Sequence, residues 1–207
     1  MIAWSLDALR ACESVRAVVV AAPPGHVHDL GGDDLVVVAG GATRARSVAN
    51  ALEAVETELV AIHDAARPLL TPELVEALVA RLDADPAAAA AIPAAAVTDT
   101  IKRARSSQAF SRQEREKARV EVERTLDRSL LWAAQTPQVF RTEALRAALE
   151  VDEAMRDAAT DEAMLVEAAA GRVLIHPVAA PNLKVTTPLD LRVAELLLAE
   201  GGGSVPE

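Results

Sequence analysis

The sequence predicts a doubly wound α/β fold with a mostly parallel sheet, and two observations carry this prediction. Residues 15–22 and 35–39 are β-branched apolar runs closed by turn residues, and such uniformly apolar strands are typical of parallel sheets covered on both faces. Residues 44–55 then show helical spacing of apolar side chains. Because strand-like and helix-like segments alternate, we expect one Rossmann-like domain over residues 1–200, followed by a flexible tail over residues 201–207.

The remaining elements follow in chain order. Residues 59–62 form a short apolar strand, and Thr71 and Pro72 are typical of a helix start. The alanine-rich residues 87–93 are ambiguous by propensity, so their position assigns them to a strand. Further along we expect a helix over residues 143–151 capped by Thr142, a helix opening at residues 160–162, strands at residues 173–178 and 183–185, and a closing helix that starts at residues 187–188.

A polar stretch in the middle of the chain interrupts this alternation. Its flanks, residues 97–102 and 122–126, alternate apolar and polar side chains as strands do. Residues 106–117 are dense in charge and are expected to form a solvated loop or a short surface helix. Two such strands make a protruding hairpin arm over about residues 97–127, which is only marginally stable unless it packs on a partner.

Composition narrows the function classes. The net charge of −10 argues against bulk nucleic-acid binding, and two Trp, two Phe and no Tyr leave little for stacking on bases. Cys12 is the single cysteine, and no apolar run reaches membrane-spanning length. We therefore expect a cytoplasmic protein that binds neither nucleic acid nor membrane. A small anionic substrate stays compatible, because a few local cations outweigh a distant acidic surface.

Residues 63–68, His-Asp-Ala-Ala-Arg-Pro, are the most informative segment, because they follow the strand at residues 59–62. Open α/β sheets bind their ligands at this carboxyl edge. Asp64 can hold a metal ion or hydroxyl groups, and Arg67 can bind an anion through two hydrogen bonds. The alternative is a surface turn closed by Pro68 with a local ion pair. The spacing alone does not decide between the two.

Three further clusters place polar groups near this edge. Residues 40–47 join a Gly-Gly turn to a helix start, where backbone N–H groups suit an anion or the edge of a base. Residues 125–128 and 135–138 form a second cluster. In residues 182–186 a lysine, Lys184, stands inside a strand-like run, and a buried lysine is costly unless it meets an anion. The four histidines show no ligand spacing, so we expect no metal held by protein side chains.

Six motifs carry a family resemblance. They are GGxxRxxSV at residues 40–48, HDAARP at 63–68, DTIKR at 99–103, LDRxxLWxxQTPQ at 126–138, TDE at 160–162 and NLKVT at 182–186. In this order and spacing the chain resembles the 2-C-methyl-D-erythritol 4-phosphate cytidylyltransferases of the non-mevalonate isoprenoid pathway. The resemblance extends from Ile2 to about Leu198.

The resemblance implies a reaction and its partners. The phosphate of methylerythritol phosphate attacks the α-phosphorus of CTP, which releases pyrophosphate and forms CDP-methylerythritol. Because both reactants are anions, catalysis consists mostly of charge neutralisation and in-line positioning. Mg²⁺ is implied as a cofactor, bound mainly through the CTP phosphates.

The resemblance also implies site residues. The family's CTP contacts correspond to Gly41, Ala42, Arg44, Ser47, Asp64 and Ala65. Its polyol phosphate contacts correspond to Asp64, Arg67, Thr100, Arg128, Thr136, Thr160 and Lys184. Arg128 and Lys184 are implied as catalytic residues that position the attacking phosphate. The family's arm crosses to a second subunit, so a homodimer is implied in which Thr100 and Arg128 serve the neighbour's site.

The chain departs from the family at its beginning. The family starts with a strand and a Gly-rich loop of the AAGxGxRxG kind, whereas Met1 corresponds to the helix after that segment. We therefore expect the first strand to be missing, which leaves a gap between its two neighbours or makes them pair directly. A misassigned start or a fragment is the expected explanation. We expect this polypeptide to be inactive or nearly so, because losing even one preorganised charge donor costs on the order of 10²–10³ in rate.

Two alternatives stay open. One is the same chemistry on another polyol phosphate, such as ribitol 5-phosphate. The other is a non-catalytic dimer module that binds a polyol phosphate without CTP. A nicotinamide dehydrogenase fits poorly, because no Gly-rich fingerprint follows the first strand.

Overall fold

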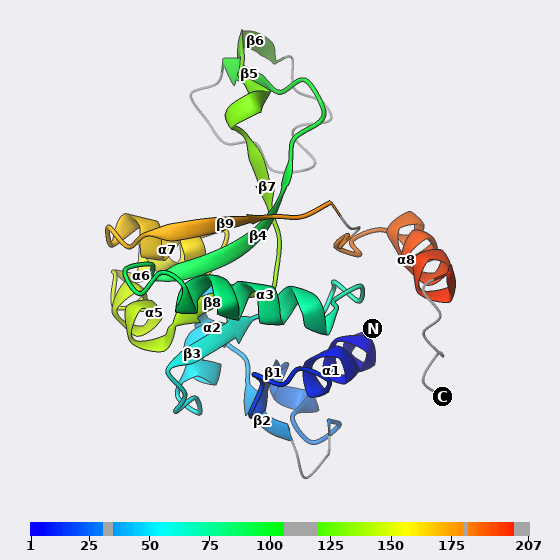
Figure 1. Ribbon diagram of the computed structural model, residues 1–207, viewed down its shortest axis with the longest axis vertical. Helices are drawn as coiled ribbons and strands as arrows, with labels where there is room; N and C mark the ends of the chain where they lie inside the picture. Colours follow the sequence, from blue (N-terminus) through cyan, green and yellow to red (C-terminus); the bar gives the residue numbers. More distant parts are fainter. Residues whose placement is uncertain (31–34, 106–119, 180–181, 201–207) are drawn as a thin grey trace.

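The computed structural model describes residues 1–30, 35–105, 120–179 and 182–200, so the predictions for residues 106–117 and 201–207 lie outside it. The α/β class is confirmed, with helices along the whole length of the chain (Figure 1). The helices are α1 (Ile2–Arg10), α2 (Arg44–Leu52), α3 (Pro72–Asp83), α5 (Thr142–Leu149), α6 (Glu153–Ala158), α7 (Glu162–Ala168) and α8 (Pro188–Glu200), with single 3-10 turns η1 (Pro24–His26) and η2 (Arg128–Leu130). The strands are β1 (Val18–Ala22), β2 (Leu35–Ala39), β3 (Leu59–Ile62), β4 (Ala90–Ala96), β5 (Lys102–Arg105), β6 (Glu121–Thr125), β7 (Trp132–Ala134), β8 (Gln138–Arg141) and β9 (Val173–Pro177).

The larger sheet has five strands and holds the core. Its path is β3-β8-β4-β7, and β9 pairs with β4 as well. β3, β4 and β9 run in one direction, since β9 pairs parallel with β4, while both β3 and β4 pair antiparallel with β8. Neighbouring residues of β4 face opposite sides, as a strand requires. Ala90 packs in one cluster with Leu145 of α5 and Leu165 of α7, while Ala91 packs with Leu78 of α3.

The first two strands form a separate sheet. β1 and β2 pair in parallel from Val18↔Leu35 to Ala22↔Ala39, and among the described residues β1 pairs with no other strand. Of the two outcomes left open by the sequence, the structure therefore shows the gap and not direct pairing between β1 and β3. β1 also begins at Val18, three residues later than expected, at the end of a segment that leads away from α1.

The polar stretch in the middle of the chain folds partly as expected. β5 and β6 pair antiparallel, with a register shift between Arg103 and Ala104. Their residues are exposed, and the pair projects away from the larger sheet (Figure 1). The flank at residues 97–101 is not a strand, although Leu126 N–H donates to the Ile101 carbonyl across it (3.0 Å).

Other local predictions need correction. Arg141, not Thr142, is the N-cap of α5, because Thr142 is already helical and its buried hydroxyl has no hydrogen-bond partner in the described structure. Residues 183–185 are not a strand; among the described residues a single backbone hydrogen bond, from Val185 N–H to the Ala66 carbonyl (2.8 Å), ties this segment to the site. The helix at residues 160–162 does open there, with Asp161 as its N-cap.

In the parts of the chain that the structure describes, no helix combines the length and the apolar character needed to cross a membrane.

Candidate active site

The turn before α2 is closed so tightly that only glycine fits at one position. A Cβ on Gly41 would lie 2.4 Å from Cβ of Arg46, far inside van der Waals contact. Gly41 N–H donates to Ser47 Oγ (3.0 Å), and Gly40 N–H donates to the Ala22 carbonyl at the end of β1 (2.7 Å). Thr43 caps the helix by accepting a hydrogen bond from Arg46 N–H. This turn therefore fixes the start of α2 against β1.

Arg44, the first residue of α2, bridges two acidic side chains. Its Nε donates to Asp64 Oδ1 (3.0 Å), and its Nη1 donates to Glu162 Oε2. Lys184 Nζ donates to the other oxygen of the same aspartate, Asp64 Oδ2 (2.8 Å). We call Arg44, Asp64, Glu162 and Lys184 the Asp64 cluster. Its members come from α2, the turn after β3, α7 and the segment before α8, so the fold gathers parts of the chain that are far apart in sequence.

Burial and charge pairing set the protonation of the cluster. Burial opposes ionisation of Asp64, but the hydrogen bond from Lys184 and the charge of Arg44 outweigh it, so its pKa is lowered. Burial likewise opposes the charge of Arg44, but Glu162 and Asp64 outweigh it and raise its pKa. Burial raises the pKa of Glu162, and Arg44 offsets part of this.

The cluster as built is neutral, because two cations face two carboxylates. An incoming phosphate must therefore draw a cation away from a carboxylate. The Lys184 side chain is 44% exposed, whereas that of Glu162 is 1% exposed. Lys184 is consequently the cation that can turn toward an anion at least cost, while Arg44 stays fixed by its buried partner.

Arg67 is held near the cluster without pairing with Asp64. Its backbone N–H donates to the Asp64 carbonyl (2.9 Å) and closes the turn. Its Nη1 donates to the Asn182 carbonyl (2.6 Å), and its buried Nε has no partner in the described structure. Burial lowers the pKa of Arg67. The alternative of a local ion pair is therefore wrong, since the partners of both side chains come from distant segments.

Thr136 and His63 hold the turn at residues 63–68 in place through hydrogen bonds. Asp64 N–H donates to Thr136 Oγ1 (3.0 Å), and Asn182 Nδ2 donates to the Thr136 carbonyl (2.8 Å). His63 lies within hydrogen-bonding distance of Thr136 Oγ1, of Ser5 Oγ and of the Arg67 carbonyl. Burial lowers the pKa of His63 to about 4, so its imidazole is neutral at pH 7.

The structure places the remaining predicted residues at the rim or in the arm. Ala65 lines a groove beside the cluster together with Ser47, and Gly41 and Ala42 line a smaller pocket of about 340 Å³. Thr160 is exposed near the start of α7, and its hydroxyl contacts Met164 Sδ (3.9 Å). Thr100 and Arg128 are exposed residues of the arm.

Within a single chain, the arm residues do not join the Asp64 cluster. The Arg128 guanidinium donates to the Thr98 carbonyl, a partner inside the arm itself. Figure 1 shows this part of the chain projecting from the sheet. Within this chain the Arg128 side chain therefore has its hydrogen-bond partner in the arm and not in the Asp64 cluster.

Sequence reasoning missed three residues of the site. Glu162 stands inside a quoted motif, but an acidic residue at a helix start is usually a favourable partner of the helix dipole, so nothing indicated a buried ion pair. His63 and Asn182 were likewise quoted without a role. Lys184 was assigned for a reason that the structure corrects: it is exposed rather than buried in a strand, yet it does meet a carboxylate.

Comparisons with known proteins agree with this geometry. The family model "IspD: 2-C-methyl-D-erythritol 4-phosphate cytidylyltransferase" matches residues 1–200. A protein of that name from Frankia casuarinae is 42% identical over 205 residues, which cover 96% of this chain and 70% of that protein. The "Bifunctional enzyme IspD/IspF" of Anaeromyxobacter dehalogenans is 40% identical over 201 residues; these cover 94% of this chain, which spans about half (49%) of that protein.

The fold of this chain is also similar to that of a solved structure. The crystal structure of 2-C-methyl-D-erythritol 4-phosphate cytidylyltransferase from Thermus thermophilus superposes with a TM-score of 0.76 at 34% identity, covering 96% of this chain and 88% of that one.

Proposed function

The chain belongs to the 2-C-methyl-D-erythritol 4-phosphate cytidylyltransferase family, and we propose that it transfers the cytidylyl group of CTP to 2-C-methyl-D-erythritol 4-phosphate. The products are CDP-methylerythritol and pyrophosphate. The observation that carries the proposal is the convergence of Arg44, Asp64 and Lys184 at the carboxyl end of β3, with Arg67 beside them. Because the reaction uses a nucleoside triphosphate and a phosphorylated polyol, the cytoplasmic location expected from the sequence is part of the proposal.

The side chains present suit this reaction. A phosphate oxygen of methylerythritol phosphate attacks the α-phosphorus of CTP as the bond to pyrophosphate breaks, and no proton needs to be transferred. Lys184 leaves Asp64 to neutralise the attacking phosphate, which it can do because it is half exposed. Asp64 then accepts hydrogen bonds from hydroxyl groups of the polyol or ribose. Arg67 lies beside Asp64 and adds a positive charge near the same ligands.

The residues of this site fit a Mg²⁺ ion that is bound through the phosphates of CTP and not through protein side chains. Both carboxylates of the Asp64 cluster are already paired, Asp64 with Arg44 and Lys184 and Glu162 with Arg44. In the described residues no group of three His, Cys, Asp or Glu side chains is arranged to hold a metal ion. This donor set supports binding of Mg²⁺ chiefly by the triphosphate, where the ion would neutralise charge on the leaving pyrophosphate.

We also propose that the protein works as a homodimer through the arm. Val122, Leu130 and Trp132 leave 57%, 77% and 39% of their surface exposed on the arm and its base. Exposed apolar side chains on a two-stranded hairpin call for a packing partner. In the dimer Thr100 and Arg128 would reach the neighbour's site.

Residues 1–207 by themselves are proposed to have little activity. A Gly-rich backbone cradle for the triphosphate does not occur in this sequence, in which adjacent glycines stand only at residues 31–32, 40–41 and 201–203. Preorganised donors of this kind contribute on the order of 10²–10³ each to rate. The residues proposed to bind the polyol phosphate are present, so we expect this polypeptide to bind the polyol phosphate but to transfer the cytidylyl group very slowly.

A transfer assay with two polypeptides tests the proposal. One is residues 1–207, and the other carries in addition the N-terminal strand and Gly-rich loop of the Thermus thermophilus relative. Each is incubated with CTP, Mg²⁺ and either methylerythritol phosphate or ribitol 5-phosphate, and the CDP-polyol is quantified by chromatography. We expect transfer to methylerythritol phosphate by the extended polypeptide and almost none by the short one. Failure of the extended, folded polypeptide with both polyols would refute the proposed function, and a preference for ribitol 5-phosphate would change the substrate.

A further inference from the structure

The carboxylate of Glu162 belongs to the Asp64 cluster but lies out of reach of a ligand. Its side chain is 1% exposed, and it accepts a hydrogen bond from Nη1 of Arg44. An ionised carboxylate is costly to bury unless a cation pairs with it, so this ion pair is held firmly. Glu162 can therefore influence ligand binding only through the residue that it pairs with.

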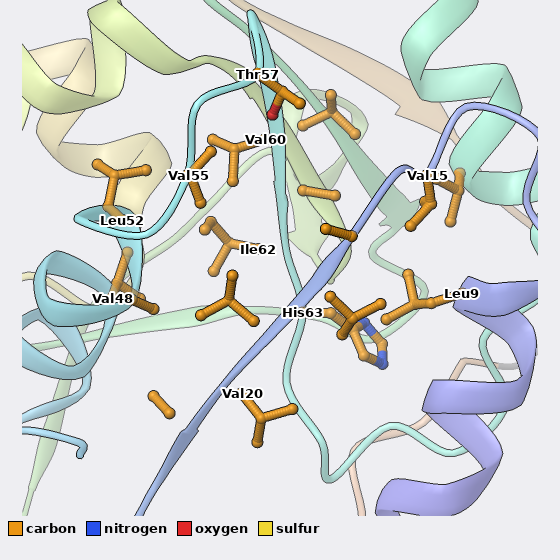
Figure 2. A pocket seen from close by; sticks show the side chains of 18 of the residues that line it. Leu9, Val15, Val20, Val48, Leu52, Val55, Thr57, Val60, Ile62 and His63 are labelled. Atoms are coloured by element: carbon orange, nitrogen blue, oxygen red, sulfur yellow. The ribbon is translucent and has the colours of Figure 1, made fainter. Parts of the chain in front are cut away.

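Core packing brings α2, α7 and β3 together next to this ion pair. Val48 and Leu52 of α2 share one buried cluster with Leu165 of α7, and Ile62 of β3 packs against that cluster. In Figure 2, Val48 and Leu52 lie on the same side of β3 as Ile62. Residues four apart lie on one face of a helix, so Arg44, four residues before Val48, begins the face of α2 that packs toward β3.

Hydrogen bonds fix the start of α7, where Glu162 is the first helical residue. Asp161 caps the helix by accepting a hydrogen bond from Met164 N–H (2.9 Å), and its other oxygen accepts one from Nε2 of Gln138 (2.9 Å). Gln138 is 1% exposed and lies opposite Ile62 in the ladder between β3 and β8. The position of Glu162 is thus tied to the carboxyl end of β3.

The guanidinium of Arg44 is shared between two carboxylates. Its Nη1 donates to Glu162, and its Nε donates to Oδ1 of Asp64 (3.0 Å). An arginine can instead bind one carboxylate through two parallel hydrogen bonds, one to each oxygen. In the described structure Oδ2 of Asp64 accepts from Lys184 and not from Arg44. The sharing of Arg44 therefore leaves one oxygen of Asp64 to another donor.

This second oxygen of Asp64 is the one that a ligand can use. The Lys184 side chain that donates to it (2.8 Å) is 44% exposed. When Lys184 turns toward a phosphate, Oδ2 of Asp64 becomes available as an acceptor for a hydroxyl group. A phosphorylated polyol supplies both the phosphate and the hydroxyl, whereas inorganic phosphate supplies no polyol hydroxyl.

We propose that Glu162 is a positioning residue that makes the site selective for a hydroxylated phosphate over inorganic phosphate. By holding Nη1 of Arg44, it keeps the guanidinium from closing on both oxygens of Asp64, so that one oxygen stays available to a ligand hydroxyl. Its negative charge also offsets the charge of Arg44, which weakens the attraction for phosphate alone. The inference rests on the proposed function, because it assigns the source of polyol phosphate recognition in the same site.

Two ligands separate a positioning role from a general effect on folding. Calorimetric titration measures Kd for methylerythritol phosphate and for inorganic phosphate in wild type and in Glu162→Gln, which keeps the size of the side chain and removes its charge. We expect the ratio of Kd for phosphate to Kd for the polyol phosphate to fall at least about tenfold, because Arg44 closes on Asp64 and the hydroxyl loses its acceptor. Glu167→Gln, exposed on the same helix, is the control that leaves the ratio unchanged.

A double-mutant cycle shows whether Glu162 acts through Arg44. Arg44→Lys keeps a cation for the buried carboxylate but lacks the planar fork that holds two carboxylates in fixed directions. In an Arg44→Lys background we therefore expect Glu162→Gln to change the ratio by less than about threefold. A tenfold change in both backgrounds would show that Glu162 acts without Arg44 and would overturn the proposal.

Crystal structures of wild type and Glu162→Gln without ligand test the geometry by itself. We expect the guanidinium of Arg44 to bind both oxygens of Asp64 in the variant and one oxygen in wild type. The same single bond to Oδ1 of Asp64 in both proteins would overturn the proposal, even if ligand binding were altered.

The titrations can also contradict the proposal without the crystal structures. An unchanged ratio in folded Glu162→Gln, or equal weakening of both ligands, would reduce Glu162 to a structural role. If wild type binds neither ligand at millimolar concentration, the proposed function fails and with it the selectivity assigned to Glu162. The crystal structures then still decide whether Glu162 sets the orientation of Asp64 through Arg44, so the two failures are distinguishable.

Discussion

At the scale of single residues, the site depends on groups whose charge is fixed by their surroundings. His63 is the clearest case, because it is buried and neutral and contacts three segments of the site through Ser5, Thr136 and the Arg67 carbonyl. Its pKa is about 4 in the folded protein and 6.5 in the unfolded chain. Between these values the unfolded chain binds a proton that the folded chain does not.

This difference predicts a loss of stability in mild acid. Stability rises with pH wherever the unfolded state binds more protons, so the contribution of His63 is complete above pH 6.5 and is lost as pH falls toward 4. We expect the free energy of unfolding to fall by about 2 kcal/mol between about pH 7.5 and pH 5 on account of His63. Urea denaturation of wild type and His63→Gln measures this. The decrease should shrink in His63→Gln and persist in His28→Gln, an exposed control; an unchanged pH dependence in His63→Gln would contradict the assignment.

The tight packing around Gly41 predicts a second effect of a single residue, a loss of stability when a larger residue replaces it. A Cβ at Gly41 would press on the backbone and Cβ of Arg46, whereas one at Gly25 would meet nothing within 4 Å. We expect Gly41→Ala to cost about 1–3 kcal/mol of stability, as overpacking does. Gly25→Ala should stay within about 0.5 kcal/mol of wild type. Thermal and urea denaturation of the two variants compare them directly, and equal stabilities would show that the turn before α2 can relax.

Lys184 predicts an effect on ligand binding rather than on stability. Because it is half exposed, Lys184→Gln should barely change Tm. Its loss should weaken binding of methylerythritol phosphate at least tenfold, since it is the cation free to turn toward the phosphate. Arg172→Gln, which removes a surface ion pair with Asp85, is the control. Calorimetric titration of both variants measures the affinities, and an equal loss in both would remove Lys184 from the site.

At the scale of elements, the arm is the part of the chain that we propose packs against a second molecule. Val122 and Leu130 are largely exposed there. We expect Val122→Lys combined with Leu130→Glu to shift the protein from dimer to monomer in sedimentation velocity experiments. Met155→Glu alters a similarly exposed apolar residue on α6 and should leave the sedimentation coefficient unchanged. A wild-type monomer at high micromolar concentration would contradict the dimer.

Sequence patterns predict an element well when the element is a buried apolar run with a clear turn at its end. β2 and β3 were bounded correctly because each is a short apolar run ended by a turn. The sequence does not predict β7 and β8, because they are only three and four residues long and lie within or just after the motif at residues 126–138. Residues 183–185 form a strand-like run in the sequence, but in the described part of the chain this segment has one backbone hydrogen bond, from Val185 to Ala66, where a strand needs a ladder. Propensity could not show which segments find a pairing partner.

At the scale of the whole molecule, the fold class followed from the sequence, but the division of the sheet did not. Whether β1 and β3 would pair directly or stay apart depends on how α1, α2 and α3 pack around them, which no local pattern contains. The same holds for the site. Asp64 and Lys184 could be named from motifs, whereas the ion pair of Arg44 with Glu162 exists only because α2 and α7 meet in the folded chain.

We propose that distant segments converge on one binding site for a phosphorylated polyol and CTP. Titration of isotope-labelled protein with methylerythritol phosphate, followed by amide chemical shifts, locates this site. We expect saturable shifts concentrated at residues 64–67, at Thr136 and at residues 182–185, which are abolished by Lys184→Gln in a protein that stays folded. Shifts confined to the pocket beside Ala42, or no saturable shifts at all, would contradict it.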